Sequence, residues 1–322
     1  MKKIKWGILG LGKIAGKFAT ALKDVEGAEL YAVASRSKTK AESFAKTHGA
    51  TKLFSSYESM LADEALDVVY IATPHVFHYE HTLLCLDNKK AVLCEKPFAI
   101  NKKQVEEMIA RAQKQQVFLM EAMWTQFLPH FKYVLDLIES EKYGKIKSLK
   151  ADFGFPAPVD LDKRLYNKSL GGGSLLDIGI YPIFMALSAL GVPEDIEAQA
   201  IFSETGIDKE CNMVFKYPND VKANLRSSII EQTSTAAIIQ FENAKLTLHK
   251  RFHEPTSITI QTPELEDTKE FNVSSNGYNF EAEHVQKMLR EGKTESTEMT
   301  FKKSLQLIDL LDKVRTKIGL EY

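Results

Sequence analysis

The chain has 322 residues, 44% of them hydrophobic and 26% charged, and 42 basic against 43 acidic residues leave a formal charge of −1. This length suits two domains that each bury a substantial apolar core. The composition is ordinary for a globular protein and excludes disordered and membrane-spanning classes. The balanced charge excludes a general electrostatic attraction to nucleic acid or to a membrane surface.

The cysteines indicate a reducing compartment. Cys85, Cys94 and Cys211 are odd in number, and no two of them are spaced as Cys-x-x-Cys. This pattern argues against a disulfide framework and against a structural zinc site. Lys5 and Lys13 interrupt the apolar run near the N-terminus, so the run is expected to be a first strand and not a signal peptide. We therefore expect a cytoplasmic protein.

A glycine-rich turn follows the first predicted strand, Ile4–Leu9. Residues 10–15 read G-x-G-x-x-A and lead into a helical pattern. Gly10 permits a tight turn, Gly12 lets the backbone approach a pyrophosphate, and free N–H groups at the helix start bind the anion. A glycine turn without a nucleotide is the less favoured alternative, because a strand and a helix frame the motif. The predicted dinucleotide site comprises Gly10, Gly12, Lys13 and Ile14.

The end of the second predicted strand, Glu29–Ala34, indicates which dinucleotide binds. Proteins that prefer NAD carry an acid here, which contacts the ribose 2′-hydroxyl. This chain instead has Ser35 and Arg36, with Lys40 beyond them. A guanidinium and hydroxyl groups suit the 2′-phosphate of NADP, so we predict NADP over NAD. The alternative is that Arg36 is an exposed charge at a helix start.

Three histidines follow another apolar strand, predicted at residues 67–72. The strand ends in Thr73-Pro74-His75, and His78 and His81 lie one turn apart on a predicted helix. No acid or cysteine cluster completes a metal site around them, so we predict no bound metal. Histidines that are solvated or that cap the helix are the favoured interpretation.

The run Ala91–Leu93 is predicted to be a further buried strand, and Cys94-Glu95-Lys96-Pro97 follows it with an acid, a base and a proline. Ligands bind outside the carboxyl ends of the strands in an open α/β sheet. Glu95 and Lys96 are therefore placed at a predicted active site. A solvated strand end is the alternative.

The sequence predicts an α/β Rossmann domain at residues 1–122 and an α+β domain for substrate binding and dimerisation at residues 123–322. The final helix, predicted at residues 301–316, could pack back on the first domain. Trp124 and Phe127 are candidates for a substrate pocket, although residues of this type at this spacing are more often plain core. Arg164 is a further pocket candidate, because it precedes a glycine triplet.

The glycine triplet, Gly171–Gly173, gives the backbone unusual freedom. Ser174 is predicted to begin a helix in which Asp177 and Tyr181 lie four residues apart. This spacing puts a carboxylate and a phenol on one helical face. The alternative is an acid in a first helical turn and a partly buried tyrosine, both without a catalytic role.

Four motifs together resemble the Gfo/Idh/MocA family of oxidoreductases, and the resemblance covers nearly the whole chain. Within the family the chain is most similar to the branch of dimeric dihydrodiol dehydrogenases and NADP-linked aldose (xylose) dehydrogenases. The motifs are G-x-G-x-x-A at residues 10–15, the segment Ala72–His75 with His78, the segment Leu93–Pro97, and the segment Gly171–Tyr181.

The resemblance implies a Rossmann domain and a second domain with a large open, mostly antiparallel sheet. It identifies Lys96 as the family's active-site lysine and implies a cis bond before Pro97. Many relatives have histidine where this chain has Tyr181, which speaks against inositol-type substrates. The resemblance also places at the cofactor Thr73, Pro74, His75, His78, Glu95 and Lys96.

Oxidation of an alcohol needs a base for the hydroxyl proton, and we expect Tyr181 to be that base. A free phenol has a pKa of about 10, so function at neutral pH requires the protein to lower it. The Lys96 ammonium favours the phenolate, and Asp177 opposes it unless it orients the substrate or Lys96. Lys96 is therefore assigned to polarising the substrate oxygen and Asp177 to orientation. Proton transfer by Lys96 itself is the alternative.

Two functions remain open from the sequence. The first is a dehydrogenase that transfers a hydride between NADP and a secondary alcohol or carbonyl of a sugar, a diol or a related hydroxyl compound. The second is a catalytically inactive NAD(P)-binding regulator of the same fold. Lys96, Asp177 and Tyr181 favour the enzyme. The expected partners are a small-molecule substrate and a second copy of the chain, bound through the C-terminal sheet, and neither nucleic acid nor a membrane.

Overall fold

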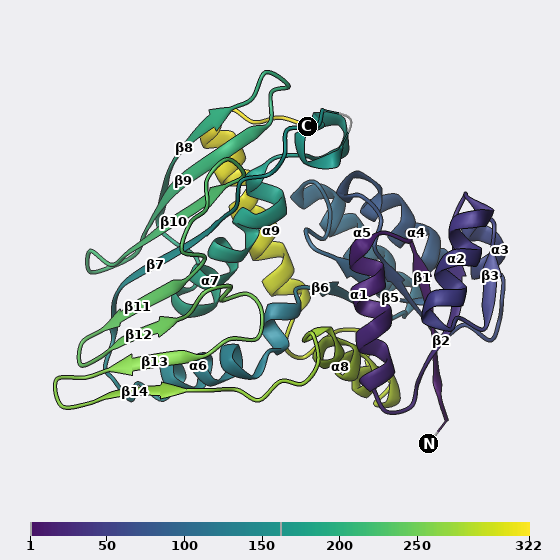
Figure 1. Ribbon diagram of the computed structural model, residues 1–322, viewed down its shortest axis with the longest axis horizontal. Coiled ribbons are helices and arrows are strands. Elements are labelled where there is room, and N and C mark those ends of the chain that lie inside the picture. Colours follow the sequence, from purple (N-terminus) through teal and green to yellow (C-terminus); the bar gives the residue numbers. More distant parts are fainter. Residues whose placement is uncertain (1, 162) are drawn as a thin grey trace. The chain divides into compact units, whose positions relative to one another are not determined.

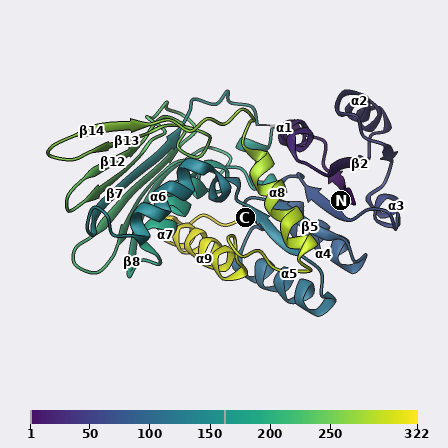
Figure 2. The same cartoon turned by 90° about the horizontal axis from the view of Figure 1, so that it is seen from below.

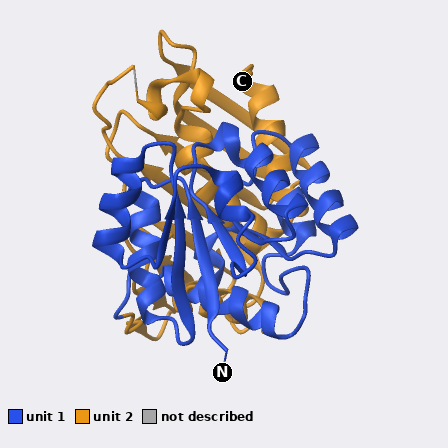
Figure 3. Cartoon of the chain, turned by 90° about the vertical axis from the view of Figure 1, so that its right-hand side faces the viewer, with its two compact units in different colours: residues 1–127, 274–305 blue, residues 128–273, 306–322 orange. Residues whose placement is uncertain are grey.

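A computed structural model describes residues 2–161 and 163–322 (Figure 1, and from below in Figure 2). The chain forms two compact units (Figure 3). Unit 1 comprises Met1–Phe127 and Ser274–Leu305, and unit 2 comprises Leu128–Val273 and Gln306–Tyr322. Unit 1 thus contains a late segment of the chain in addition to the predicted first domain. The predicted division of function at residue 122 stays a prediction.

Unit 1 is built on a six-stranded parallel sheet in the order β3-β2-β1-β4-β5-β6. All residues of β4 and β5 are buried, as expected of strands that helices cover on both faces. The order and direction of the strands confirm the predicted Rossmann architecture. The strands are β1 (Ile4–Leu9), β2 (Ala28–Ala34), β3 (Lys52–Phe54), β4 (Val68–Ile71), β5 (Ala91–Glu95) and β6 (Leu119–Ala122).

Helices flank this sheet on both sides (Figure 3). Asn101 is the N-cap of α5, because its side chain accepts the N–H of Gln104 at 3.0 Å. The α-helices of unit 1 are α1 (Lys13–Ala21), α2 (Lys38–His48), α3 (Tyr57–Leu61), α4 (His78–Asp87), α5 (Lys102–Gln115) and α8 (Tyr278–Arg290). Short 3-10 turns are η1 (Leu22–Asp24), η2 (His75–Phe77) and η3 (Trp124–Phe127).

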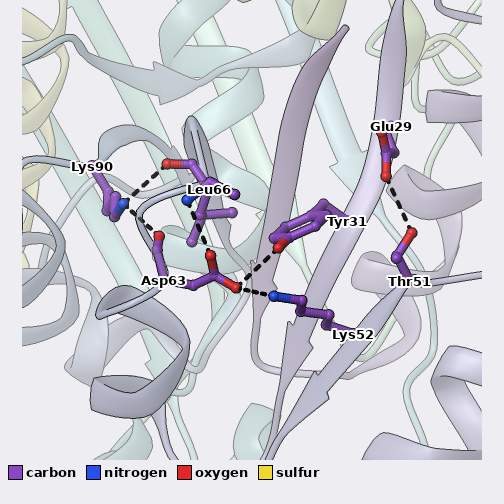
Figure 4. Close-up of polar contacts among 8 residues, drawn as sticks. Glu29, Tyr31, Thr51, Lys52, Asp63, Leu66 and Lys90 are labelled. Carbon is purple, nitrogen blue, oxygen red and sulfur yellow. Dashed lines mark hydrogen bonds and ion pairs between the residues drawn. The ribbon is translucent and has the colours of Figure 1, made fainter.

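A polar network ties one edge of this sheet together (Figure 4). The carboxylate of Asp63 accepts hydrogen bonds from the Tyr31 hydroxyl at 3.0 Å and from Lys52 Nζ at 2.7 Å. Lys90 Nζ donates to the backbone carbonyls of Asp63 at 2.7 Å and of Leu66 at 3.1 Å. Lys52, Leu66 and Lys90 lie at or just before the amino ends of their strands. The network therefore stabilises the amino ends of the strands. The candidate site residues lie at the opposite, carboxyl ends.

Unit 2 is built on an eight-stranded sheet in the order β14-β13-β12-β11-β7-β10-β9-β8. Its strands pair antiparallel except β7 and β10, which run parallel. This confirms the predicted large, mostly antiparallel sheet. The strands are β7 (Ile146–Gly154), β8 (Asp195–Phe202), β9 (Asp208–Lys216), β10 (Lys222–Ser228), β11 (Ala237–Phe241), β12 (Lys245–Leu248), β13 (Ile258–Gln261) and β14 (Glu266–Lys269).

The helices of unit 2 cover one face of this sheet, as Figure 2 shows for α6 and α7. Ala151, Met213 and Leu225 are buried on the covered face, whereas Lys150 and Asn224 are exposed on the other face. This alternation is that of a sheet with one covered face. The helices are α6 (Pro129–Glu139), the 3-10 turns η4 (Arg164–Tyr166) and η5 (Lys168–Leu170), the π-helical turn η6 (Leu175–Gly179), α7 (Ile180–Leu190) and α9 (Phe301–Ile318), whose first five residues belong to unit 1.

One helical stretch among the described residues, Lys168–Leu190, is long and apolar enough to cross a membrane by length and composition. Its mean hydropathy is 1.6, and 83% of its apolar window is buried inside the structure. Burial of this extent is typical of a helix in a protein core.

Candidate functional site

The glycine turn of unit 1 has the geometry of a pyrophosphate cradle. Gly10 has a φ of +85°, and a Cβ there would lie 2.8 Å from the backbone of Ala72. Only glycine fits such a position without strain. Gly12 is exposed at the start of α1, and a Cβ there would meet no atom within 4 Å. The turn thus leaves open space beside free N–H groups at a helix N-terminus, which suits a dinucleotide phosphate.

Arg36 is exposed immediately after β2, beside the Ser37 side chain that caps α2 by accepting the Lys40 N–H at 3.4 Å. Its charge acts on two rings, those of Tyr57 and His81, which lie edge to face at 4.9 Å. Burial raises the pKa of Tyr57, and the Arg36 guanidinium opposes that rise. Arg36 is therefore close to an aromatic wall, and its exposure leaves the guanidinium accessible to an anion.

The favoured prediction was that the histidines after β4 are solvated or cap the helix. They are buried, so the prediction that they are solvated is wrong. His75, His78 and His81 are 6%, 0% and 9% exposed. The two ring nitrogens of His78 lie 2.8 Å from the backbone carbonyls of Pro97 and Thr73. Burial lowers the pKa of His78 to about 4. His78 therefore links the end of β4 to the turn after β5, and a contact with the cofactor stays a prediction.

The turn after β5 presents Lys96, which is half-buried and precedes a cis peptide bond to Pro97. The cis bond confirms the prediction. The strand itself runs through Glu95, two residues beyond the predicted end at Leu93. The buried Glu95 carboxylate accepts the Lys96 backbone N–H at 3.2 Å through Oε2 and the Tyr70 hydroxyl through Oε1.

Two further buried acids lie near this turn, and the sequence reasoning missed both. Glu121 accepts the Phe98 N–H at 3.0 Å, and burial raises its pKa to about 7. Burial, and then the charge of Glu95, raise the pKa of Glu281 well above the usual range. Glu281 falls within the apolar spacing of α8. A charged residue on the apolar stripe of a helix is the signal that could have found it.

Trp124 and Phe127 are both buried in unit 1, in the turn η3. Trp124 stacks on Tyr278 with ring centroids 4.2 Å apart, and Phe127 packs on His284 at 4.8 Å. These contacts are those of core residues, which is the alternative given above. A role of either residue in a substrate pocket stays a prediction.

In unit 2, the glycine triplet passes close to a buried acid, Asp208, that was not predicted from the sequence. This close approach explains why Gly173 has no room for a side chain. Gly173 has a φ of +116°, and a Cβ there would lie 2.1 Å from Oδ1 of Asp208. The other oxygen of Asp208 accepts the Ser174 hydroxyl and the Leu175 N–H, both at 2.7 Å. The Tyr322 hydroxyl donates to the Gly172 carbonyl at 2.5 Å. The triplet lets the chain pass close to these groups while Asp208 holds the start of the next helix.

That helix begins as the π-helical turn Leu175–Gly179 and not as the α-helix predicted from the sequence. Turns of this kind occur mostly inside α-helices and often at functional sites. The turn carries Asp177, whose Oδ1 forms an ion pair with Arg164 Nη2 at 2.8 Å. The structure thus brings together two of the predicted site residues, Arg164 from before the glycine triplet and Asp177 from after it.

Tyr181 is buried in the first turn of α7. Its ring lies 4.6 Å from the His253 ring and 5.8 Å from the Phe153 ring, and the latter two rings stack at 4.2 Å. His253 also approaches Glu254, with Nε2 3.6 Å from the carboxylate. His253 was not predicted, because no motif surrounds it. Among residues 2–161 and 163–322, no three His, Cys, Asp or Glu side chains form a group that could hold a metal ion.

Two family models match the sequence. Residues 4–123 match the "Oxidoreductase family, NAD-binding Rossmann fold", and residues 131–247 match the "GFO/IDH/MocA C-terminal domain". Both matches fall on the regions whose sheets are described above.

Similar proteins are enzymes. The trans-1,2-dihydrobenzene-1,2-diol dehydrogenase of Xenopus tropicalis is 35% identical, and the alignment covers 99% of each chain. The scyllo-inositol 2-dehydrogenase (NADP(+)) IolU of Bacillus subtilis (strain 168) is 33% identical over 99% of this chain and 98% of the relative. The structure of KijD10, a 3-ketoreductase from Actinomadura kijaniata in complex with NADP and TDP-benzene, is 25% identical with a TM-score of 0.89, over 98% of each chain.

Proposed function

This chain belongs to the Gfo/Idh/MocA family of oxidoreductases, and on that premise we propose that it is an NADP-dependent dehydrogenase. The reaction would transfer a hydride between NADP and a secondary alcohol or carbonyl of a sugar, a diol or a related hydroxyl compound. The observation that carries the proposal is the position of Lys96 in the turn at the carboxyl end of β5. Ligands of such sheets bind at these strand ends.

The cofactor assignment is supported by the residues at the carboxyl ends of β1 and β2. Gly12 leaves space for a pyrophosphate beside the N-terminus of α1. Arg36, with Ser35 and Lys40, offers positive charge and hydroxyl groups to a 2′-phosphate and no carboxylate that would repel it. The relative from Bacillus subtilis is named as an NADP(+) enzyme, and KijD10 was solved with NADP. When bound, NADP would supply the hydride acceptor or donor.

The proposed chemistry assigns the proton to Tyr181 and the substrate oxygen to Lys96. During oxidation, the Tyr181 phenolate would take the hydroxyl proton as the carbonyl forms, and the Lys96 ammonium would stabilise the developing negative charge on oxygen. The ion pair of Asp177 with Arg164 fits a positioning role for that carboxylate. Proton transfer by Lys96 itself is the alternative within the same proposal.

The substrate class is supported by the named relatives, which act on a dihydrodiol and on an inositol. The test is a panel of aldoses, polyols and vicinal diols, offered with NADP and with NAD, and followed at the absorbance band of the reduced nicotinamide. We expect turnover of at least one member with NADP. Tight NADP binding with no turnover of any member would contradict the proposal.

We also propose that two copies of the chain associate through the open face of the eight-stranded sheet, in the cytoplasm. This face carries a hollow with a volume of about 670 Å³, whose lining includes apolar residues and the polar residues Lys150, Asn212 and Arg226. A polar face fits an interface with many hydrogen bonds and bridging waters. Light scattering should give a molar mass twice that of the chain. Reversal of charge at Arg226 should lower the measured molar mass. A monomer at all concentrations would contradict the proposal.

A further inference from the structure

The Glu95 carboxylate is held on both of its oxygens. Oε1 accepts the Tyr70 hydroxyl from β4, and Oε2 accepts the backbone N–H of Lys96 at 3.2 Å. Tyr70 is itself fixed, because its ring stacks on Phe18 with centroids 3.8 Å apart and it is fully buried. Hydrogen bonds to a carboxylate favour its charged form. The geometry therefore favours an anionic Glu95 next to Lys96.

A second acid, Glu281, interacts electrostatically with Glu95 but does not accept such hydrogen bonds among the described residues. Glu281, on α8, is fully buried, and neither of its carboxyl oxygens has a hydrogen-bond partner in the part of the chain that the structure describes. Its pKa is raised by burial and by the charge of Glu95. Two carboxyl groups that share a dry site cannot both ionise at low cost. The pair therefore holds one negative charge, and the hydrogen bonds place it on Glu95.

The neighbouring Tyr70 and Glu121 do not carry this negative charge. Burial, and then the charge of Glu95, keep the Tyr70 hydroxyl neutral by raising its pKa. Glu121 is also buried, with a raised pKa, and accepts a backbone N–H. Other titratable groups that interact electrostatically with members of this cluster include Cys94 on β5, Lys96 in the turn after it, His78 on α4 and Tyr278 on α8.

We propose that Tyr70 is a positioning residue for Lys96: its hydroxyl keeps the single negative charge of the Glu95–Glu281 pair on Glu95, directly beside the lysine. The proposal rests on the function proposed above, in which Lys96 acts as an ammonium. An anionic Glu95 favours that ammonium, and the same carboxylate fixes the backbone from which the lysine side chain extends. Glu281 serves as the neutral member of the pair.

The test is Tyr70→Phe, which keeps the ring on Phe18 and removes only the hydroxyl. The matched control is Tyr217→Phe, because Tyr217 is buried and its hydroxyl has no hydrogen-bond partner among the described residues. Without the donor, Glu95 gains a proton more readily. The acid limb of the pH profile of kcat/KM should move up by about one pH unit, so that kcat/KM falls about tenfold at pH values below the wild-type limb and little above it. The affinity for NADPH, measured by fluorescence, should not change.

A second measurement needs no turnover. The hydrogen bond stabilises the folded protein only while Glu95 is charged, so its contribution is present at high pH and is lost as pH falls through the pKa of Glu95. The difference in Tm between wild type and Tyr70→Phe should therefore shrink on acidification, and Tyr217→Phe should show no such trend. If no substrate is turned over by wild type, the proposed function fails while this measurement still tests the charge on Glu95.

Glu281→Gln separates the two acids. Because Glu281 is neutral in this account, the amide should leave the acid limb in place. The proposal is overturned if Tyr70→Phe behaves like Tyr217→Phe in both the pH profile and the Tm series, or if Glu281→Gln moves the acid limb upward as Tyr70→Phe is expected to do.

Discussion

Each unit buries an acid directly beneath a candidate catalytic segment, and the two acids differ in what holds them. In unit 1, Glu95 accepts one backbone N–H and the hydroxyl of Tyr70, a residue of a neighbouring strand. In unit 2, Asp208 accepts the hydroxyl and the N–H of two consecutive residues, Ser174 and Leu175. Asp208 therefore holds the backbone at the start of a helix, whereas Glu95 is also proposed to place a negative charge beside Lys96. Burial of an acid does not by itself tell which of these two tasks it performs.

Removal of the unit 2 acid should have the largest effect on stability. Asp208→Ala removes the acceptor of the buried Leu175 N–H and one of the two partners of the Ser174 hydroxyl, and the free energy of unfolding should fall by about 3 kcal/mol. Denaturant unfolding with a fluorescence readout measures this loss. The control is Asp267→Ala on the exposed strand β14. Equal stability of the two variants would remove Asp208 from its supporting role.

Glu121 is a third buried acid, and its raised pKa means that its burial lowers the free energy of unfolding once the pH exceeds the ordinary pKa of a glutamate. Its pKa is about 7 in the folded protein against an ordinary 4.5. Between these values the unfolded chain loses the proton while the folded protein keeps it, so stability falls as pH rises. Glu121→Gln keeps an acceptor for the Phe98 N–H. Relative to wild type, it should gain roughly 3 kcal/mol at pH 8 and nothing near pH 4. A gain independent of pH would contradict this assignment.

Arg36 provides the contrast of an exposed charge, for which a smaller effect is expected. Arg36→Asp replaces a donor for the 2′-phosphate by a group that repels it and that can accept the 2′-hydroxyl of NAD. The KM for NADP should rise about tenfold and the KM for NAD should fall, as measured in initial-rate assays. Movement of both constants in the same direction would show that Arg36 is only an exposed charge at the start of α2.

The architecture of both units could be predicted from the sequence, because its signals are local. Apolar runs of four to six residues gave strands such as Ile4–Leu9 with their observed bounds, and the side chain of Asn101 marked the start of α5. Gly10 was identified by a turn that its φ of +85° now explains.

The parts of the site that escaped prediction depend on contacts between distant residues. Nothing near Asp208 in the sequence shows that its carboxylate accepts the Ser174 hydroxyl, just before the π-helical turn. Tyr70 reads as one more apolar strand residue, although its hydroxyl holds Glu95. His253 likewise lies far along the chain from Tyr181, whose ring it contacts. Local patterns therefore located the candidate catalytic residues but not the groups that hold them.

We propose above that Lys96 and Tyr181 serve one reaction. The most direct measurement is kcat for Lys96→Met, Tyr181→Phe and the double variant, with NADPH affinity measured in parallel by fluorescence. Each single variant should lower kcat by about a hundredfold or more with NADPH affinity retained, and the double variant should lose much less than the product of the single losses, because residues that act as a unit are not additive. Near-normal turnover in either single variant, or losses that multiply in full, would contradict the account.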